Sequence, residues 1–101
     1  MDTKWYSNGL TTEKANRLKK EYAVIRNPIY GINDRNELAL IVSLESERGI
    51  NTDCYLDDKG DIKSLLLETK SPEVSKLEGK VIEIYKNNKY LVGISVNKNL
   101  I

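Results

Sequence analysis

The clearest pattern of apolar and polar residues in the chain lies near its end, between residues 79 and 97. This stretch reads GKVIEIYKNNKYLVGISVN, and two apolar runs separated by Asn87-Asn88 predict a β-hairpin. We prefer a three-residue loop at 87–89, because a two-residue loop would place Glu83 among the apolar side chains. In this register the core face carries Ile82, Ile84, Tyr90, Val92, Ile94 and Val96, and the outward face carries Glu83, Tyr85, Gly93 and Ser95.

The strands before the hairpin are expected within residues 22–56. Residues 22–26 (YAVIR) are apolar and β-branched enough for a first strand. Asn27-Pro28 should end it, since proline cannot donate an amide proton to a neighbouring strand. Glycine, asparagine and aspartate then predict an exposed loop over residues 27–36, a kind of segment that often carries binding residues.

Residues 37–45 (ELALIVSLE) give the strongest single strand pattern. Both faces are largely apolar, which is typical of a strand in the middle of a sheet or covered on both sides. After a turn at 46–49, residues 50–56 (INTDCYL) alternate cleanly. Ile50, Thr52, Cys54 and Leu56 should face the core, with Asn51, Asp53 and Tyr55 on the other face.

Two shorter regions have helical patterns. Residues 12–21 place apolar side chains three and four positions apart behind a threonine cap. Residues 61–76 should contain a helix capped by Asp61 and then a helical turn that starts at Ser71-Pro72. Residues 1–10 form an N-terminal arm, in which Trp5 either packs the arm onto the domain or anchors a partner.

Together these elements predict a single α+β domain over residues 1–101. We expect about five antiparallel strands, arranged as a sandwich or a small open barrel. Two or three short helices and the C-terminal hairpin complete this fold.

Composition excludes several classes of chemistry. The chain of 101 residues has no histidine and one cysteine, Cys54. A Ser-His-Asp or Cys-His catalytic arrangement therefore cannot be built, zinc ligands are too few, and no intramolecular disulfide can form. The six glycines are isolated, so the chain has no glycine-rich phosphate loop. We expect no enzyme activity, no cofactor and no bound metal.

Nothing in the sequence indicates a membrane or secretory role. The N-terminal residues lack an apolar signal segment, and no apolar run approaches the length of a membrane span. We therefore expect a cytoplasmic protein without a membrane partner, and we leave its oligomeric state open.

Charge is unevenly distributed, although the formal net charge is only +1. Residues 31–61 carry eight acidic and three basic groups, a net −5, between two segments that each carry a net +3. Such an acidic segment can steer a basic partner or imitate nucleic-acid phosphate, whereas the alternative is a solvated surface of mixed charge. We predict a protein-binding surface with aromatic anchors. The candidate residues are Trp5, Tyr30, Asp34, Glu45, Glu47, Asp53, Asp57 and Asp58.

A second hypothesis concerns the hairpin tip. Small β-barrels bind single-stranded nucleic acid through aromatic side chains beside lysines. Tyr85, Lys86, Lys89 and Tyr90 have this composition. The domain is weakly basic for such a role, because phosphate contact calls for clustered positive charge.

Three stretches, in order, resemble a class of small proteins from phages and mobile elements: YAVIRNPIYGINDRNELALIVSLE, DIKSLLLE and LEGKVIEIYKNNKYLVGIS. The pattern L-x-G-K-x-x-x-V is represented by Leu77, Gly79, Lys80 and Ile84. This class includes anti-CRISPR and other anti-defence inhibitors, which occupy a surface of a larger nuclease complex. The resemblance implies a host protein or protein–nucleic-acid complex as partner and transfers no residue roles. A structural phage component is a third hypothesis.

Overall fold

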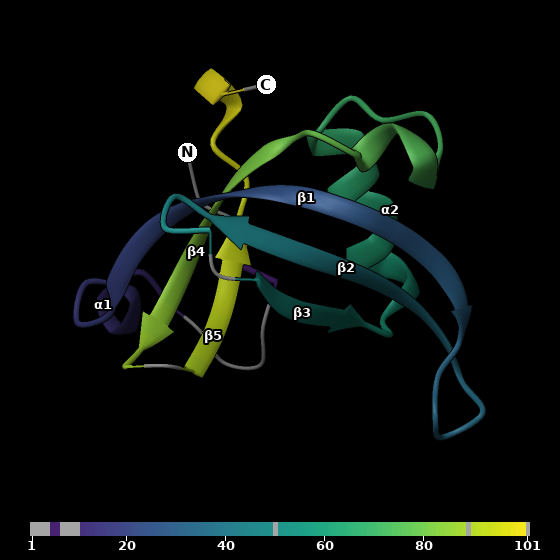
Figure 1. Ribbon diagram of the computed structural model, residues 1–101, viewed down its shortest axis with the longest axis horizontal. Helices are drawn as coiled ribbons and strands as arrows, with labels where there is room; N and C mark the ends of the chain where they lie inside the picture. Colours follow the sequence, from purple (N-terminus) through teal and green to yellow (C-terminus); the bar gives the residue numbers. More distant parts are fainter. Residues whose placement is uncertain (1–4, 7–10, 50, 89, 101) are drawn as a thin grey trace.

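One long strand, β1 (Lys19–Ile32), crosses the molecule and pairs with a neighbour along each of its edges (Figure 1). The other strands are β2 (Leu38–Ser46), β3 (Asn51–Leu56), β4 (Val81–Asn87) and β5 (Tyr90–Ser95). Their order is β3-β2-β1-β4-β5, and neighbouring strands are antiparallel. The computed structural model describes residues 5–6, 11–49, 51–88 and 90–100. The predicted α+β fold with a five-stranded antiparallel sheet is confirmed.

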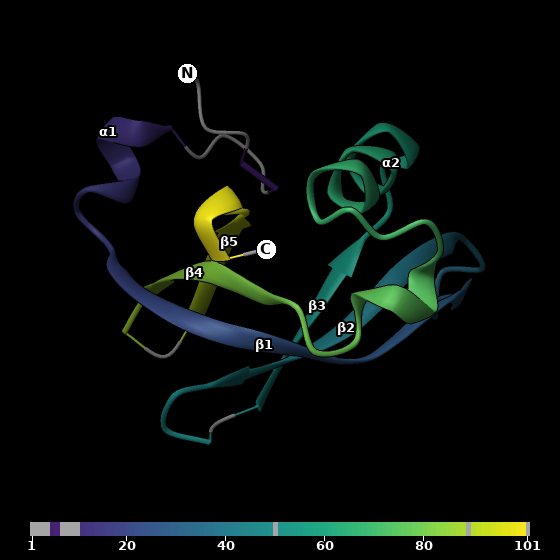
Figure 2. The same cartoon turned by 90° about the horizontal axis from the view of Figure 1, so that it is seen from above.

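The sheet curls into a half-barrel, as the view from above shows (Figure 2). Helix α2 (Lys59–Glu68) lies on the concave side, where Ile62 and Leu65 pack into a core that receives side chains from all five strands. Cys54 faces this core, as the alternation of its strand predicts. The remaining elements are the short helix α1 (Thr12–Ala15) and two 3-10 turns, η1 (Val74–Leu77) and η2 (Lys98–Leu100).

A second, smaller apolar cluster lies on the opposite face of the hairpin. Tyr85 is only 8% exposed there, and Trp5 meets it edge-on with the ring centroids 4.9 Å apart. Trp5 therefore packs onto the domain, which is one of the two roles expected for it. The other members of the cluster are Ala15, Leu18 and Val92.

Helix α1 is much shorter than the helix predicted over residues 12–21. It ends at Ala15, and β1 already begins at Lys19. Lys19 and Glu21 belong to the ladder between β1 and β4, and the Glu21 carboxylate lies 3.7 Å from the ammonium of Lys86. Sheet pairing outweighs helix propensity here, because propensity is a weak preference and a short helix is costly to nucleate.

The loop predicted over residues 27–36 is wrong, because β1 continues through Asn27-Pro28. The register with β2 shifts just after Arg26, and Asn27 adopts a positive φ of 49°. This β-bulge accommodates the proline, since a bulged residue is not required to donate to the ladder. The Asn27 amide donates instead to the Glu78 carboxylate at 2.8 Å. Only a tight turn around Asn33 connects β1 to β2.

Helix α2 begins earlier than predicted and is capped by Asp58, not by Asp61. The Asp58 carboxylate accepts a hydrogen bond from the Asp61 amide at 2.9 Å, which is the usual geometry of an aspartate cap. Ser71 also caps no helix. It is buried with its hydroxyl 2.9 Å from that of Thr69, and the following turn, η1, starts only at Val74.

The C-terminal hairpin has a shorter loop than predicted. Asn87 lies opposite Tyr90, whereas Tyr85 lies opposite Gly93, so the odd residue forms a bulge within β5. Ile82, Ile84 and Ile94 face the core as predicted. The bulge changes the faces near the tip, however: Tyr90 is 76% exposed, Val92 joins the outer cluster, and Leu91 packs against the core. The predicted outward residues Glu83, Tyr85 and Ser95 share a face but are buried.

Candidate functional site

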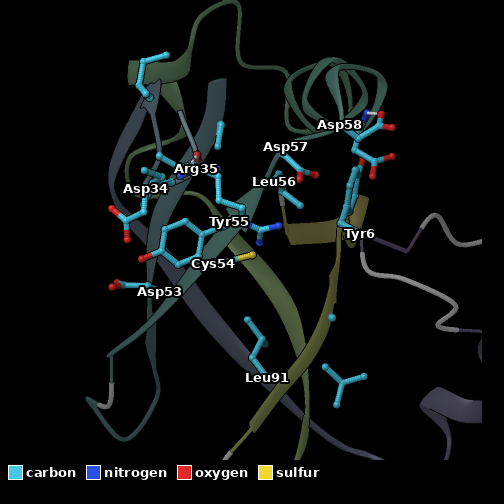
Figure 3. A pocket seen from close by; sticks show the side chains of 17 residues that line it. Tyr6, Asp34, Arg35, Asp53, Cys54, Tyr55, Leu56, Asp57, Asp58 and Leu91 are labelled. Atoms are coloured by element: carbon cyan, nitrogen blue, oxygen red, sulfur yellow. Dashed lines mark hydrogen bonds between the residues drawn. The ribbon is translucent and has the colours of Figure 1, made fainter. Parts of the chain in front are cut away.

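A cleft of about 890 Å³ follows the free edge of β3, and we call it the β3 cleft (Figure 3). Four successive residues of the strand, 53–56, line it, although neighbouring side chains of a strand point to opposite faces. The cleft therefore includes the backbone edge of β3, and it extends onto the neighbouring strand, since Ala39 and Ile41 of β2 also line it. The other walls come from Tyr6, from residues of β5, from the start of α2 and from the end of β1 with the turn after it.

The β3 cleft is strongly acidic. Within the described part of the chain, five aspartates line it, against one basic side chain, that of Arg35. Clefts lined by charge of one sign concentrate ligands of the opposite sign. The aspartates are Asp34 from the β1–β2 turn, Asp53 from β3, and Asp57, Asp58 and Asp61 from the end of β3 and the start of α2.

The structure brings half of the predicted protein-binding residues together in this cleft, namely Asp34, Asp53, Asp57 and Asp58. The other half lie elsewhere. Glu45 is paired with Arg26 at 3.3 Å, and Glu47 is exposed in the turn after β2. Trp5 packs on Tyr85, and Tyr30 borders a separate groove beside α2.

Two tyrosines of the β3 cleft were not among the predicted site residues. Tyr55 is 60% exposed and neighbours Asp53 on the same face of β3, so the alternation of residues 50–56 contained the signal for it. Tyr6 gave no such signal, because its position depends on contacts distant in sequence. Its hydroxyl donates to Glu68 of α2, and burial together with that carboxylate raises the pKa of the Tyr6 phenol.

The two edges of the half-barrel differ. The amide of Tyr6 donates to the carbonyl of Ile94 at 3.0 Å, so Tyr6 occupies part of the β5 edge. Along the outer edge of β3, no segment within the described residues forms backbone hydrogen bonds. An unpaired edge is a template for another extended chain, and acidic residues beside it disfavour pairing with an identical edge.

The chemistry of the β3 cleft favours binding. Burial raises the pKa of the Cys54 thiol to about 11, so the thiol is protonated at neutral pH and is a weak nucleophile. In the part of the chain that the structure describes, no three aspartate, glutamate or cysteine side chains are grouped so that they could hold a metal ion.

No helix in that part is long and apolar enough to cross a membrane.

The residues of the nucleic-acid hypothesis do not form one exposed surface. Tyr85 is covered by Trp5, and Lys86 is 7% exposed with its ammonium paired to Glu21. Tyr90 is exposed at the tip, and Lys89 lies outside the described residues. Stacking on bases needs an open aromatic face beside free cations, which Tyr85 and Lys86 do not offer in this arrangement.

Comparison with sequence models of protein families, with curated proteins and with solved structures found no match to this chain.

Proposed function

We propose that the protein is a non-enzymatic protein-binding domain that takes an extended, basic segment of a partner into the β3 cleft. The observation that supports this most directly is the outer edge of β3, which no described segment pairs with and which lies in a cleft lined by five aspartates. Main-chain hydrogen bonds to the edge would supply affinity, and side-chain pockets on alternate sides would supply specificity.

The alternation of β3 indicates what the segment should look like. Asp53 and Tyr55 lie on one face, so lysine or arginine at alternate positions could pair with the carboxylate and lie against the exposed ring. Cys54 and Leu56 lie on the other face and belong to the apolar core. Small apolar side chains suit the positions between the basic ones.

A partner protein is favoured over a second copy of this chain at the β3 cleft. Two copies paired edge to edge would bring two sets of aspartates together, and like charges across an interface are costly. A basic surface that normally holds nucleic acid has the complementary charge. If the protein acts as the anti-CRISPR inhibitors that it resembles do, it would occupy such a surface in a host nuclease complex.

The test is selection of random extended peptides on the full-length protein, followed by hydrogen exchange. We expect basic residues at alternate positions in the selected peptides, and slower exchange at β3 amides when a peptide binds. The variant Asp34→Lys/Asp53→Lys/Asp57→Lys should weaken binding by about tenfold or more. Its matched control, Glu13→Lys/Glu47→Lys/Glu73→Lys, makes the same charge change at exposed acids outside the cleft.

Equal loss of binding in both triple variants would attribute the effect to net charge and reject the site. Unchanged exchange at β3 in a bound complex would reject strand addition. Peptides without basic enrichment would reject the proposed partner chemistry.

A further inference from the structure

A second hollow of about 490 Å³, which we call the α2 groove, borders a different face of α2. The helix contributes residues 59, 62, 63, 66 and 67, a spacing of three and four that defines one helical face. Tyr30 of β1, together with Ser71, Pro72 and Val74 after the helix, forms the facing side. The groove therefore follows α2 for about 12 Å, or a little more than two helical turns.

The lining of the α2 groove is predominantly apolar and poorly covered. Ile62 belongs to the main core, and Leu66 and Val74 pack against it while partly exposed. Leu67 is 69% exposed and Tyr30 44% exposed. A contiguous apolar surface of this kind on a small domain marks an interaction site more often than a scattered exposed leucine does.

Among the residues that the structure describes, the charged side chains that line the α2 groove are two lysines. Lys59 and Lys63 are four residues apart, one above the other on α2, and both are exposed. Within the described residues neither lysine forms an ion pair. The complement of this surface is an apolar stripe flanked by carboxylates one helical turn apart.

We infer that the α2 groove binds an acidic amphipathic helix of a partner protein. Apolar residues at i, i+3 or i+4, and i+7 of that helix would fill the groove beside Leu66 and Leu67. Its carboxylates, one turn apart, would pair with Lys59 and Lys63. A fatty acid has one carboxylate and would leave one lysine without a partner. The inference is independent of the β3 cleft, whose lining shares no residue with this groove.

The test is selection of helical peptides of about 16 residues from a random display library on the full-length protein. We expect the selected peptides to carry an apolar stripe flanked by glutamate or aspartate, and to bind Leu67→Glu at least about tenfold more weakly. Lys59→Glu/Lys63→Glu should weaken binding by a similar factor. The control Lys70→Glu/Lys76→Glu makes the same charge change at exposed lysines that do not line the groove, and it should bind as the wild type does.

Selected peptides without acidic enrichment, or binding unaffected by the Lys59→Glu/Lys63→Glu change, would overturn the inference. So would displacement of a groove-bound apolar dye by oleate but by no selected peptide, since that result assigns the groove to a lipid. A wild-type dimer in sedimentation that Leu67→Glu converts to a monomer would assign it to a second copy instead. Leu67 is largely exposed, so Leu67→Glu should fold, and circular dichroism checks this.

Discussion

The β3 cleft and the α2 groove border the same helix but offer opposite surfaces. The cleft presents a backbone edge, two tyrosines and five aspartates, whereas the groove presents apolar side chains and two lysines. The change in sign occurs between neighbouring residues, because Asp58 lines the cleft and Lys59 lines the groove. A short helix thus separates the two proposed recognition surfaces, which would attract different segments.

The opposite charges of the two surfaces would direct each kind of partner segment to one of them. A basic strand is repelled by the lysines of the groove, and an acidic helix is repelled by the aspartates of the cleft. In this proposal each segment would have one place to bind, and the two places share no lining residue. Two such contacts on one partner would reinforce each other through effective concentration.

The largest expected effect comes from removing the packing that both surfaces share. Leu65 lies on α2, is fully buried and belongs to the main core. Leu65→Ala should lower the free energy of unfolding by about 3 kcal/mol, through lost apolar burial and the cavity left behind. Urea denaturation measures this, and the variant should bind both classes of peptide more weakly because α2 forms a wall of each hollow.

Leu67→Ala is the matched control, the same substitution two positions along the same helix at an exposed site. It should change unfolding stability by less than about 0.5 kcal/mol and should weaken only the helical peptides. Similar stability losses in the two variants would contradict the burial assigned to Leu65.

The second largest expected effect is on the alkylation rate of Cys54, which lines the β3 cleft and not the α2 groove. Because burial raises the pKa of Cys54 to about 11, its alkylation near pH 8 should be roughly 100-fold slower than that of a free cysteine. The rate should rise with pH until the thiol ionises. Stability follows the same group: the contribution from the protonated thiol is complete below about pH 8.5 and is lost as pH rises toward 11.

The alkylation rate of Cys54 can also be compared with a peptide bound at one site or at the other. A peptide bound in the β3 cleft should slow alkylation of Cys54 further, because Cys54 lines that cleft. A peptide bound in the α2 groove should leave the rate unchanged. Equal protection by both peptides would show that the two surfaces are not separate.

Salt should weaken binding at the two sites to different extents, by about fivefold more at the β3 cleft than at the α2 groove. Raising ionic strength from about 0.05 to about 0.5 M shortens the screening length severalfold, so it should weaken a basic strand in the cleft by roughly tenfold. The helix in the groove should weaken only about twofold, because buried apolar area depends little on screening. Fluorescence anisotropy at several salt concentrations measures both, and parallel salt slopes would remove the proposed contrast.

More of the β3 cleft than of the α2 groove could be predicted from the sequence. Strand alternation placed Cys54 on the core face and Asp53 on the opposite face, and the acidic segment identified four of the five aspartates. The groove could not be predicted, because Tyr30 was assigned to a loop over residues 27–36, whereas β1 in fact continues to Ile32. The continuation of β1 beyond Pro28 depends on its pairing with β2, a segment distant in sequence. The position of Tyr6 on β5 depends on a distant contact in the same way. No local pattern encodes such contacts.

The smallest predicted effect separates charge from helix capping at the boundary between the two surfaces. Asp58→Ala should cost about 1 kcal/mol of stability, because its carboxylate caps α2 through the Asp61 amide. Asp57→Ala removes the same charge from the same cleft but no capping bond, so its stability should change by less than about 0.5 kcal/mol.

Both variants should weaken a basic peptide in the β3 cleft by a similar factor of about two, since each deletes one carboxylate of its lining. Thermal unfolding and peptide titration on the two variants measure the two quantities side by side. A binding loss confined to Asp58→Ala would mean that the cleft depends on the position of α2 rather than on its charge. The contrast between the two surfaces would then be one of shape, and the preference for a basic partner would have to be abandoned.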